Sequence, residues 1–424
     1  MPGVAQPFAA TRAMSRFLTN KAVPFHALIE PAQDAVRQAL AASASPVVLV
    51  VHDWCMFAFH THTGKPDRYQ RSHDKDPGYD LGSALVVDAA DGRPLGPMEF
   101  RLRTANGMLG TRVGPIANPP GHVDELLGVM DGSRRWDLGK TPVRVIDREA
   151  DSVGHYRAWQ SRGHTFLVRA DPERVVTWRG DEVGLAAVVA GSAPDFRDVL
   201  DARGRHEVVT TQKGAGRLQV VGAAVTLHRP AEKSTGERTP AGNKTKADVP
   251  GPPIPLRLVI GRVVDELGVV RAEWLLLTNA EDGQADAAAV ARWHAWRWRI
   301  ESDHKLLKSA GLNAEEWQQE TGEAFLRRLA VASMAGLTVW HLQRDESEDA
   351  ARLRRVLVRL SGRQMAYRVE STAPALLAGL EKLLAIDDLL RGEDLAEILA
   401  LARKVLPTLF RSGQQNAQSR KMCS

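Results

Sequence analysis

Two acidic residues each follow a short segment rich in β-branched residues. Residues 46–52, rich in valine, lead into Asp53, and residues 143–146 lead into Asp147. Continuous runs of β-branched residues are typical of strands that are buried on both faces. The sequence therefore predicts one carboxylate at the end of each buried strand, a place where a single acid is more often a cap or turn residue than a catalytic group.

A third acid, Glu301, lies in a segment with helical periodicity, residues 285–309. Basic side chains follow it and precede it in steps of three and four, and so share its helix face: His294, Arg297, Lys305 and Lys308. Ordinary ion pairs between residues four apart, each worth roughly a few tenths of a kcal/mol, explain part of this pattern. Three carboxylates from separate elements are also what a hard divalent cation takes from a protein.

The rest of the pattern describes the elements that must position these acids. Residues 81–102 predict an antiparallel pair of strands with a turn at Asp91–Gly92, and residues 123–130 predict a helix. The opposite face of the Glu301 helix carries side chains that can pack it against this sheet: Trp293, Trp296, Ile300 and Leu307. The order of elements is that of an α/β sheet with an antiparallel portion.

With these three acids in order, the sequence resembles the transposases of the insertion-sequence-four family, the group that includes the transposase of transposon five, over roughly residues 14–345. The family signature Tyr-x2-Arg-x3-Glu-x6-Lys is matched, with histidine in place of tyrosine, by His294, Arg297, Glu301 and Lys308. The block from Asp147 to Asp151 is similar to the family's second-aspartate block, and Asp53 resembles its first aspartate.

This resemblance implies a ribonuclease-H-like catalytic domain with an inserted β-rich subdomain and a helical C-terminal region. It implies two Mg²⁺ or Mn²⁺ ions held by Asp53, Asp147 and Glu301, and a cut-and-paste transposase that nicks DNA, forms and opens a hairpin, and transfers the strand. The implied partners are double-stranded DNA, as transposon-end inverted repeats and target, and a second copy of the chain.

The resemblance also implies DNA contacts. Arg297, Lys305 and Lys308 would hold the DNA backbone, and His294 would donate a hydrogen bond to a phosphate. Trp274 would stack on a flipped base, which stabilises it by about 1–3 kcal/mol, or it is a tryptophan of a strand core. Arg148 and Glu149 support the second metal ligand or contact DNA, or are charges at a helix N-terminus.

Changes in composition and in expected secondary structure along the chain predict six segments. They are a remnant of an N-terminal DNA-binding region (1–45), the first part of the catalytic domain (46–170), a β-rich insertion (171–280), the second part with the Glu301 helix (281–345), a helical region assigned to dimerisation by position (346–412) and a disordered tail (413–424). Within the insertion, residues 230–255 are rich in Pro, Gly and Lys and predict a mobile loop.

Charge and cysteine content narrow the class of protein. The chain of 424 residues has 56 basic against 51 acidic side chains, and nine arginines against four acids fall between Arg327 and Arg368. This run predicts a basic surface for a polyanion, or a solvated helix face. Only two cysteines occur, which excludes a disulfide framework. No long apolar segment or secretion signal is apparent, so we expect a bacterial cytoplasmic protein without a membrane partner.

The sequence also allows other sites and other functions. His60, His62 and His73 lie in one connection without the spacing of a closed metal site, and Cys55 has the apolar neighbours of a packed residue rather than a nucleophile. The short N-terminus suggests a truncated copy, so a non-catalytic remnant that binds DNA or dimerises and inhibits a full-length transposase is one alternative. A metal-dependent nuclease without strand transfer is another.

Overall fold

The valine-rich segment forms β1 (Val47–Ala58), the strand around which a large mixed sheet is built. In this computed structural model, which describes residues 7–60, 64–70, 76–238, 244–366 and 369–405, β1 pairs antiparallel with β3 (Pro77–Asp88) and parallel with β6 (Thr141–Ile146). The first six residues of β1 are buried. A strand with a neighbour on both edges and a layer on both faces needs apolar side chains on both faces, which is why the run does not alternate.

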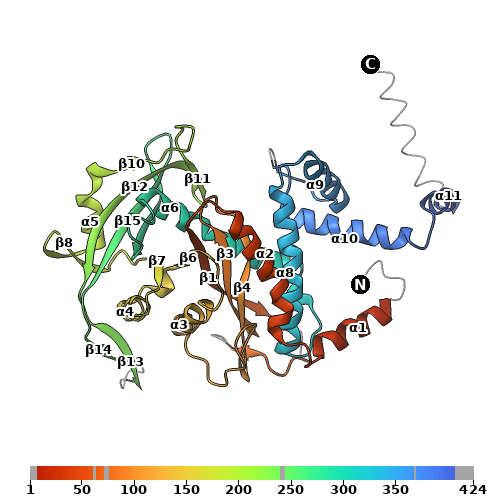
Figure 1. Cartoon of the computed structure of the whole chain (residues 1–424), viewed down its shortest axis with the longest axis horizontal. Coiled ribbons are helices and arrows are strands. Elements are labelled where there is room, and N and C mark those ends of the chain that lie inside the picture. The colour runs from red at the N-terminus through yellow and green to blue at the C-terminus, as the bar shows by residue number, and fades with distance from the viewer. Residues whose placement is uncertain (1–6, 61–63, 71–75, 239–243, 367–368, 406–424) are drawn as a thin grey trace, which may run out of the picture. The chain divides into compact units, whose positions relative to one another are not determined.

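The sheet has 14 strands, and its main path runs β5-β4-β3-β1-β6-β7-β16-β15-β12-β8-β9 (Figure 1). Within this path β1, β6 and β7 are parallel and all other neighbours are antiparallel. The remaining strands are β2 (Tyr69–Gln70), β4 (Pro94–Thr104), β5 (Gly107–Gly110), β7 (Thr165–Arg169), β8 (Val175–Trp178), β9 (Asp181–Gly184), β10 (Arg197–Asp198), β11 (Val208–Thr211), β12 (Gly214–Leu227), β15 (Ile254–Val264) and β16 (Val270–Thr278).

Helices cover both faces of this sheet. They are α2 (Phe25–Ala42), α3 (His122–Ser133), α4 (Val153–Ser161), α5 (Leu185–Gly191), α6 (Ala287–Trp296), α7 (Trp298–Lys305) and α8 (Gly322–Arg344), with short turns η1 (Arg148–Ala150), η2 (Ala193–Asp195), η3 (Leu306–Ala310) and η4 (Ala314–Glu316). One core cluster joins α3, α4 and α5 to the sheet and includes the stacked rings of Tyr156 and Phe166. Helix α6 lies on the other face, where a Cβ on Gly261 would contact Ala291.

The mixed α/β class predicted from the sequence is confirmed, and so are the helix at 123–130 and the turn at Asp91–Gly92. The predicted loop at 230–255 is wrong where the structure describes it. Strands β13 (Ala231–Arg238) and β14 (Lys244–Val249) form a two-stranded hairpin that is separate from the main sheet, in the lower left of Figure 1. A hairpin outside the main sheet needs no apolar face, so its sequence does not show the alternation that predicts strands.

The chain divides into two units, Ala22–Leu337, which contains the sheet, and Met1–Lys21 with Thr338–Ser424. The second unit holds α1 (Pro7–Thr19), α9 (Glu348–Ser361), α10 (Ala373–Leu390) and α11 (Leu395–Val405). Helices α9 and α10 cross closely, since a Cβ on Gly379 would lie 2.1 Å from the carbonyl oxygen of Leu357. Several leucines of α10 and α11 are exposed, and the predicted role of this region in dimerisation stays a prediction.

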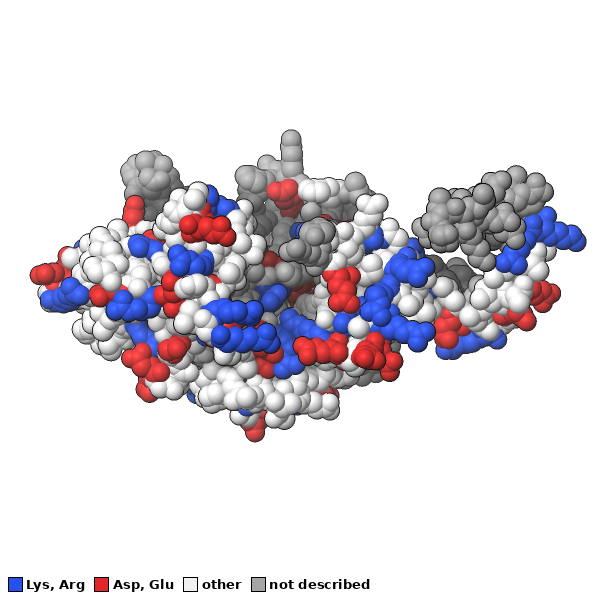
Figure 2. Space-filling view, turned by 90° about the horizontal axis from the view of Figure 1, so that it is seen from above, with Lys and Arg blue, Asp and Glu red and all other residues white. Residues whose placement is uncertain are grey.

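The arginines between 327 and 368 do not all lie at the surface. Arg327 is 3% exposed and donates to the carbonyl oxygen of Val23, and Arg354 is 7% exposed and donates to that of Leu342. These two arginines stabilise local structure, so the basic surface predicted from their count is smaller than expected. On the face shown in Figure 2, Lys and Arg side chains of the described residues form several separate groups with Asp and Glu between them.

In the part of the chain that the structure describes, helices of the length and apolarity needed to cross a membrane are absent.

Candidate active site

Asp53 lies where β1 extends past the end of its parallel neighbour. Pairing with β6 stops at His52, opposite Ile146, whereas pairing with β3 continues to Ala58. The prediction that Asp53 ends the strand is therefore wrong, because only the apolar part of β1 needs neighbours on both edges. The carboxylate of Asp53 is 24% exposed, and its Oδ1 accepts a hydrogen bond from the backbone N–H of Trp54 at 2.8 Å.

Asp147 is the first residue after β6, as the sequence predicted. Its backbone is extended, and its carbonyl oxygen accepts the first hydrogen bond of the short helix η1, from Ala150 at 3.0 Å. Because β1 and β6 are parallel neighbours, the two aspartates lie at the same edge of the sheet, the edge at which parallel sheets bind ligands. The side chain of Asp147 is 40% exposed.

Glu301 reaches this edge from α7. The segment predicted as one helix over 285–309 is three consecutive helical pieces, with Arg297 between α6 and α7 and the π-type turn η3 after Lys305. The backbone of Arg297 keeps helical angles, so the predicted face is retained across the first break. Glu301 is 37% exposed and lies one turn beyond Arg297.

One guanidinium contacts all three acids. Arg297 Nη1 lies 3.6 Å from Asp53 Oδ2, and Arg297 Nη2 lies 3.4 Å from Asp147 Oδ2 and 3.0 Å from Glu301 Oε1. The oxygens of Asp147 and Glu301 are thus no further apart than the sum of those last two distances. That separation is within the span of a pair of metal ions set roughly 4 Å apart. The structure brings the three sequence-predicted acids together.

The three carboxylates have different proton affinities. Burial raises the pKa of Asp53 and of Glu301, although the positive charge of Arg297 opposes the rise in both. Burial also disfavours the charged form of Asp147, but Arg297 and the backbone N–H of Arg148 outweigh it and lower the pKa of that carboxyl. Asp147 is the acid most firmly held as an anion, and so the strongest single attraction for a cation.

The residue types fit a divalent metal, since Mg²⁺ and Mn²⁺ take carboxylate oxygens. One observation favours such a partner: Asp147 Oδ1 is buried without a hydrogen-bond partner among the described residues. The arrangement itself does not form a metal site, because three His, Cys, Asp or Glu side chains close enough to hold one ion are not found within the described ranges. Arg297 takes the central position that an ion would need.

His294 and Trp274 lie behind this cluster, away from solvent. His294 is 2% exposed, and burial lowers its pKa to about 3, so its imidazole is neutral. Trp274 is 8% exposed, and its ring meets that of His294 edge to face with centroids 5.2 Å apart. In this arrangement neither ring is presented at the surface, so base stacking by Trp274 and phosphate binding by His294 require the neighbouring elements to move.

The remaining predicted DNA contacts lie nearer the surface. Lys305 is exposed on the last turn of α7. Lys308 donates to the carbonyl oxygen of Met56 at 2.6 Å and lies 3.3 Å from Glu315, so it is anchored to β1. Arg148, directly after Asp147, is 55% exposed and pairs loosely with Asp171 at 3.9 Å.

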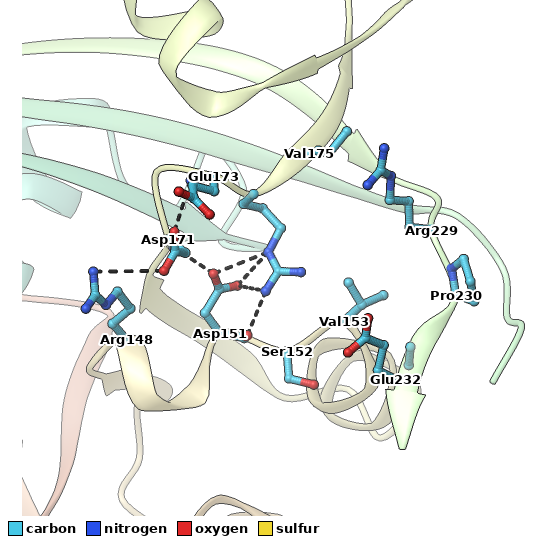
Figure 3. A pocket seen from close by; sticks show the side chains of 12 residues that line it. Arg148, Asp151, Ser152, Val153, Asp171, Glu173, Val175, Arg229, Pro230 and Glu232 are labelled. Carbon is cyan, nitrogen blue, oxygen red and sulfur yellow. Dashed lines mark hydrogen bonds and ion pairs between the residues drawn. The ribbon is translucent and has the colours of Figure 1, made fainter. Parts of the chain in front are cut away.

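A polar pocket of about 520 Å³ lies beside Arg148, between the start of α4 and the base of the β13–β14 hairpin (Figure 3). Its arginines already have acidic partners. Arg174 pairs with Asp151 at 3.0 Å, and Arg229 pairs with Glu182. The pocket therefore has polar walls close to the acidic cluster, and Arg148 is the most loosely paired of the arginines that line it.

One neighbouring cluster has no counterpart in the sequence pattern. His122, at the start of α3, contacts Asp80 of β3 through Nε2 and lies 3.3 Å from Glu149 through Nδ1. Its ring stacks on Trp54 with centroids 5.1 Å apart and planes 3° from parallel. His122 thus links β1, β3 and the turn after Asp147. These groups are far apart in the sequence, and only the fold brings them together.

The other histidines and the cysteine do not enlarge the site. His62 and His73 lie outside the described residues, and His60 follows β1 at its far end. Burial raises the pKa of the Cys55 thiol well above its usual range. A thiol that stays protonated is a poor nucleophile, in agreement with the packing role expected for this residue.

Comparisons with known proteins add little. No family model and no curated protein matches the chain. Among solved structures, it is similar to the piggyBac transposase synaptic complex with hairpin DNA, at 10% identity and a TM-score of 0.28, over 71% of this chain and 55% of that one. It is also similar to the Drosophila P element transposase strand transfer complex, at 9% identity and a TM-score of 0.18, over 82% and 68%.

The chain thus spans about half of the piggyBac transposase chain. With TM-scores of this size, neither likeness carries weight for the fold or the activity of this protein. The resemblance to the insertion-sequence-four family stays a prediction from sequence motifs.

Proposed function

We propose that this protein is a DNA transposase whose catalytic groups are Asp53, Asp147 and Glu301. The observation that carries the proposal is the convergence of these three acids, from two parallel strands and a helix, on the single guanidinium of Arg297. The acids lie far apart in the sequence, and each is indicated by a sequence motif independently of the fold. Chance placement of three motif acids at one sheet edge is a poor alternative.

The strand arrangement supports a ribonuclease-H-like assignment for this part of the chain. Three antiparallel strands, β4, β3 and β1, continue into two parallel ones, β6 and β7. The two aspartates lie on the central strand and directly after its parallel neighbour. The strands β8 to β16 fall between Asp147 and Glu301 in sequence, which is the position expected for the β-rich insertion.

Asp53, Asp147 and Glu301 would hold two Mg²⁺ or Mn²⁺ ions. When bound, such ions supply an activated oxygen nucleophile and stabilise the leaving oxygen of a phosphodiester. The chain's own groups would bind and orient DNA: Lys305 and Arg148 can pair with backbone phosphates, and Lys308 fixes the end of α7 against β1. DNA end repeats, target DNA and a second copy of the chain are the proposed partners.

The test is cleavage of a duplex that carries the inverted repeats flanking the gene, with Mg²⁺. We expect hairpin-ended and joined products from the wild-type chain. Glu301→Gln should abolish them while leaving DNA affinity, measured without a divalent metal, within about twofold, because it removes a metal ligand and not a phosphate contact. Glu266→Gln, in the exposed turn between β15 and β16, removes an acid of the same type and should leave cleavage unchanged.

Two results would replace this proposal. Metal-dependent nicking of any duplex, without joined products, would identify a nuclease. Binding of DNA without cleavage by the wild-type chain would identify a non-catalytic remnant. Equal loss of binding and cleavage in Glu301→Gln would show that Glu301 has a structural role.

A further inference from the structure

Arg297 occupies the position on which the three acids converge. Its side chain is only 4% exposed, and its two terminal nitrogens contact one oxygen each of Asp53, Asp147 and Glu301. A divalent cation held by all three acids at once would need the central position that the guanidinium fills. Guanidinium and metal are therefore competitors for the same carboxylates.

Two buried atoms of this cluster have no hydrogen-bond partner within the described part of the chain: Arg297 Nε and Asp147 Oδ1. An N–H group without an acceptor suits an anion, and a carboxylate oxygen without a donor suits a cation. A planar guanidinium also matches phosphate geometry better than it matches three separate carboxylates. The cluster thus lacks one negative and one positive partner, and a DNA phosphate with a divalent cation would supply both.

We propose that Arg297 holds the place of the divalent cations until a DNA phosphate draws its guanidinium away, so that this chain takes up metal and DNA together. This inference rests on the proposed function. The free chain then binds metal weakly, because the ion must break contacts with Arg297. With DNA present the three carboxylates are released, and the site loads. As a consequence, the protein without DNA does not hold bound metal ions with which it could cut DNA indiscriminately.

The size of the effect follows from the exposure of the partners. The three carboxylates are 24%, 40% and 37% exposed, so each contact with Arg297 is screened and modest. Together they should weaken metal binding about tenfold, which lies within the usual range for coupling between two ligands. Coupling is reciprocal, so metal should tighten DNA binding by the same factor.

The experiment measures Mn²⁺ binding to the full chain from the electron paramagnetic resonance signal of free Mn²⁺, with and without a short duplex DNA of arbitrary sequence. Without DNA, Arg297→Ala should bind Mn²⁺ about tenfold more tightly than the wild type. Adding DNA should tighten Mn²⁺ binding about tenfold in the wild type and by less than about twofold in Arg297→Ala.

Two further variants separate this role from general effects. Arg299→Ala removes an exposed arginine two residues away on α7 and should behave as the wild type does, which excludes a simple change of net charge. Arg297→Lys keeps the charge and should restore most of the weak metal binding. Far-UV circular dichroism confirms that each variant is folded.

The inference is overturned if Arg297→Ala and the wild type bind Mn²⁺ equally without DNA. Cleavage of DNA by the wild type would then leave the proposed function standing. If neither chain binds Mn²⁺ with or without DNA, the proposed function fails, and the inference fails with it.

Discussion

The turn between β3 and β4 supports the helix that carries the basic motif. Gly92 has a φ of +71°, and a Cβ placed on it would lie 2.5 Å from the indole ring of Trp296. Trp296 is the last residue of α6 and precedes Arg297. Gly92→Ala therefore tests whether this turn, distant in sequence, packs against α6 next to the arginine that contacts the three acids.

The expected loss has two parts. A non-glycine residue at positive φ costs about 1 kcal/mol, and forcing a methyl group against a packed ring costs about 1–3 kcal/mol. Gly139 has a φ of +61°, and a Cβ placed on it would have nothing within 4 Å, so Gly139→Ala should show the first part alone. Gly92→Ala should lower the free energy of unfolding by about 2–4 kcal/mol, and Gly139→Ala by about 1 kcal/mol.

Urea denaturation followed by far-UV circular dichroism measures both losses. The double variant Gly92→Ala/Trp296→Ala removes the ring that the new methyl group meets, so its loss should be smaller than the sum of the two single losses. Equal losses for Gly92→Ala and Gly139→Ala, together with additivity in the double variant, would refute the contact between this turn and α6.

Three further outcomes are expected. Gly78→Ala should lower the free energy of unfolding by about 3 kcal/mol in the same titration, because its Cβ would lie 1.9 Å from the carbonyl oxygen of Phe57 and force β1 and β3 apart; a loss below about 1 kcal/mol would contradict that close approach. Lys305→Ala should weaken duplex binding and reduce its salt slope by about 1 in fluorescence anisotropy, without a change in stability; an unchanged slope would remove Lys305 from the DNA contacts. Burial lowers the pKa of His164, which pairs with Asp131, so the unfolded chain, with a pKa of 6.5 at this residue, takes up the proton at a higher pH than the folded chain does. Wild-type stability should therefore fall more than that of His164→Gln as the pH drops through 6.5; parallel curves would contradict this assignment.

The acids could be selected from sequence because each follows a local signal. The apolar run before Asp147 ends where β6 ends, so strand and motif coincide. The run before Asp53 ends where parallel pairing ends, although β1 itself continues. A run of apolar residues shows where a strand is covered on both faces and both edges, but it does not show where the strand is bonded to one neighbour only. The end of β6 was therefore predicted correctly and the end of β1 was not.

The role of Arg297 could be predicted only in part. Its contact with Glu301 spans four residues of helix and follows from periodicity. Its contacts with Asp53 and Asp147 depend on how α7 crosses the sheet edge, which no local pattern specifies. The same reason accounts for His122, whose partners come from two strands and a turn.

The unequal lengths of β1 and β6 explain why Glu301 is held beside Asp53. Beyond His52 the edge of β1 that faced β6 has no strand neighbour among the described residues, and its polar backbone groups need other partners. The N–H of Ala58 donates to Glu315 Oε1 at 2.9 Å, and the carbonyl oxygen of Met56 accepts from Lys308 at 2.6 Å. Both side chains come from the segment that follows Glu301. The segment that bonds to the free edge of β1 therefore continues directly from the helix that carries the third acid.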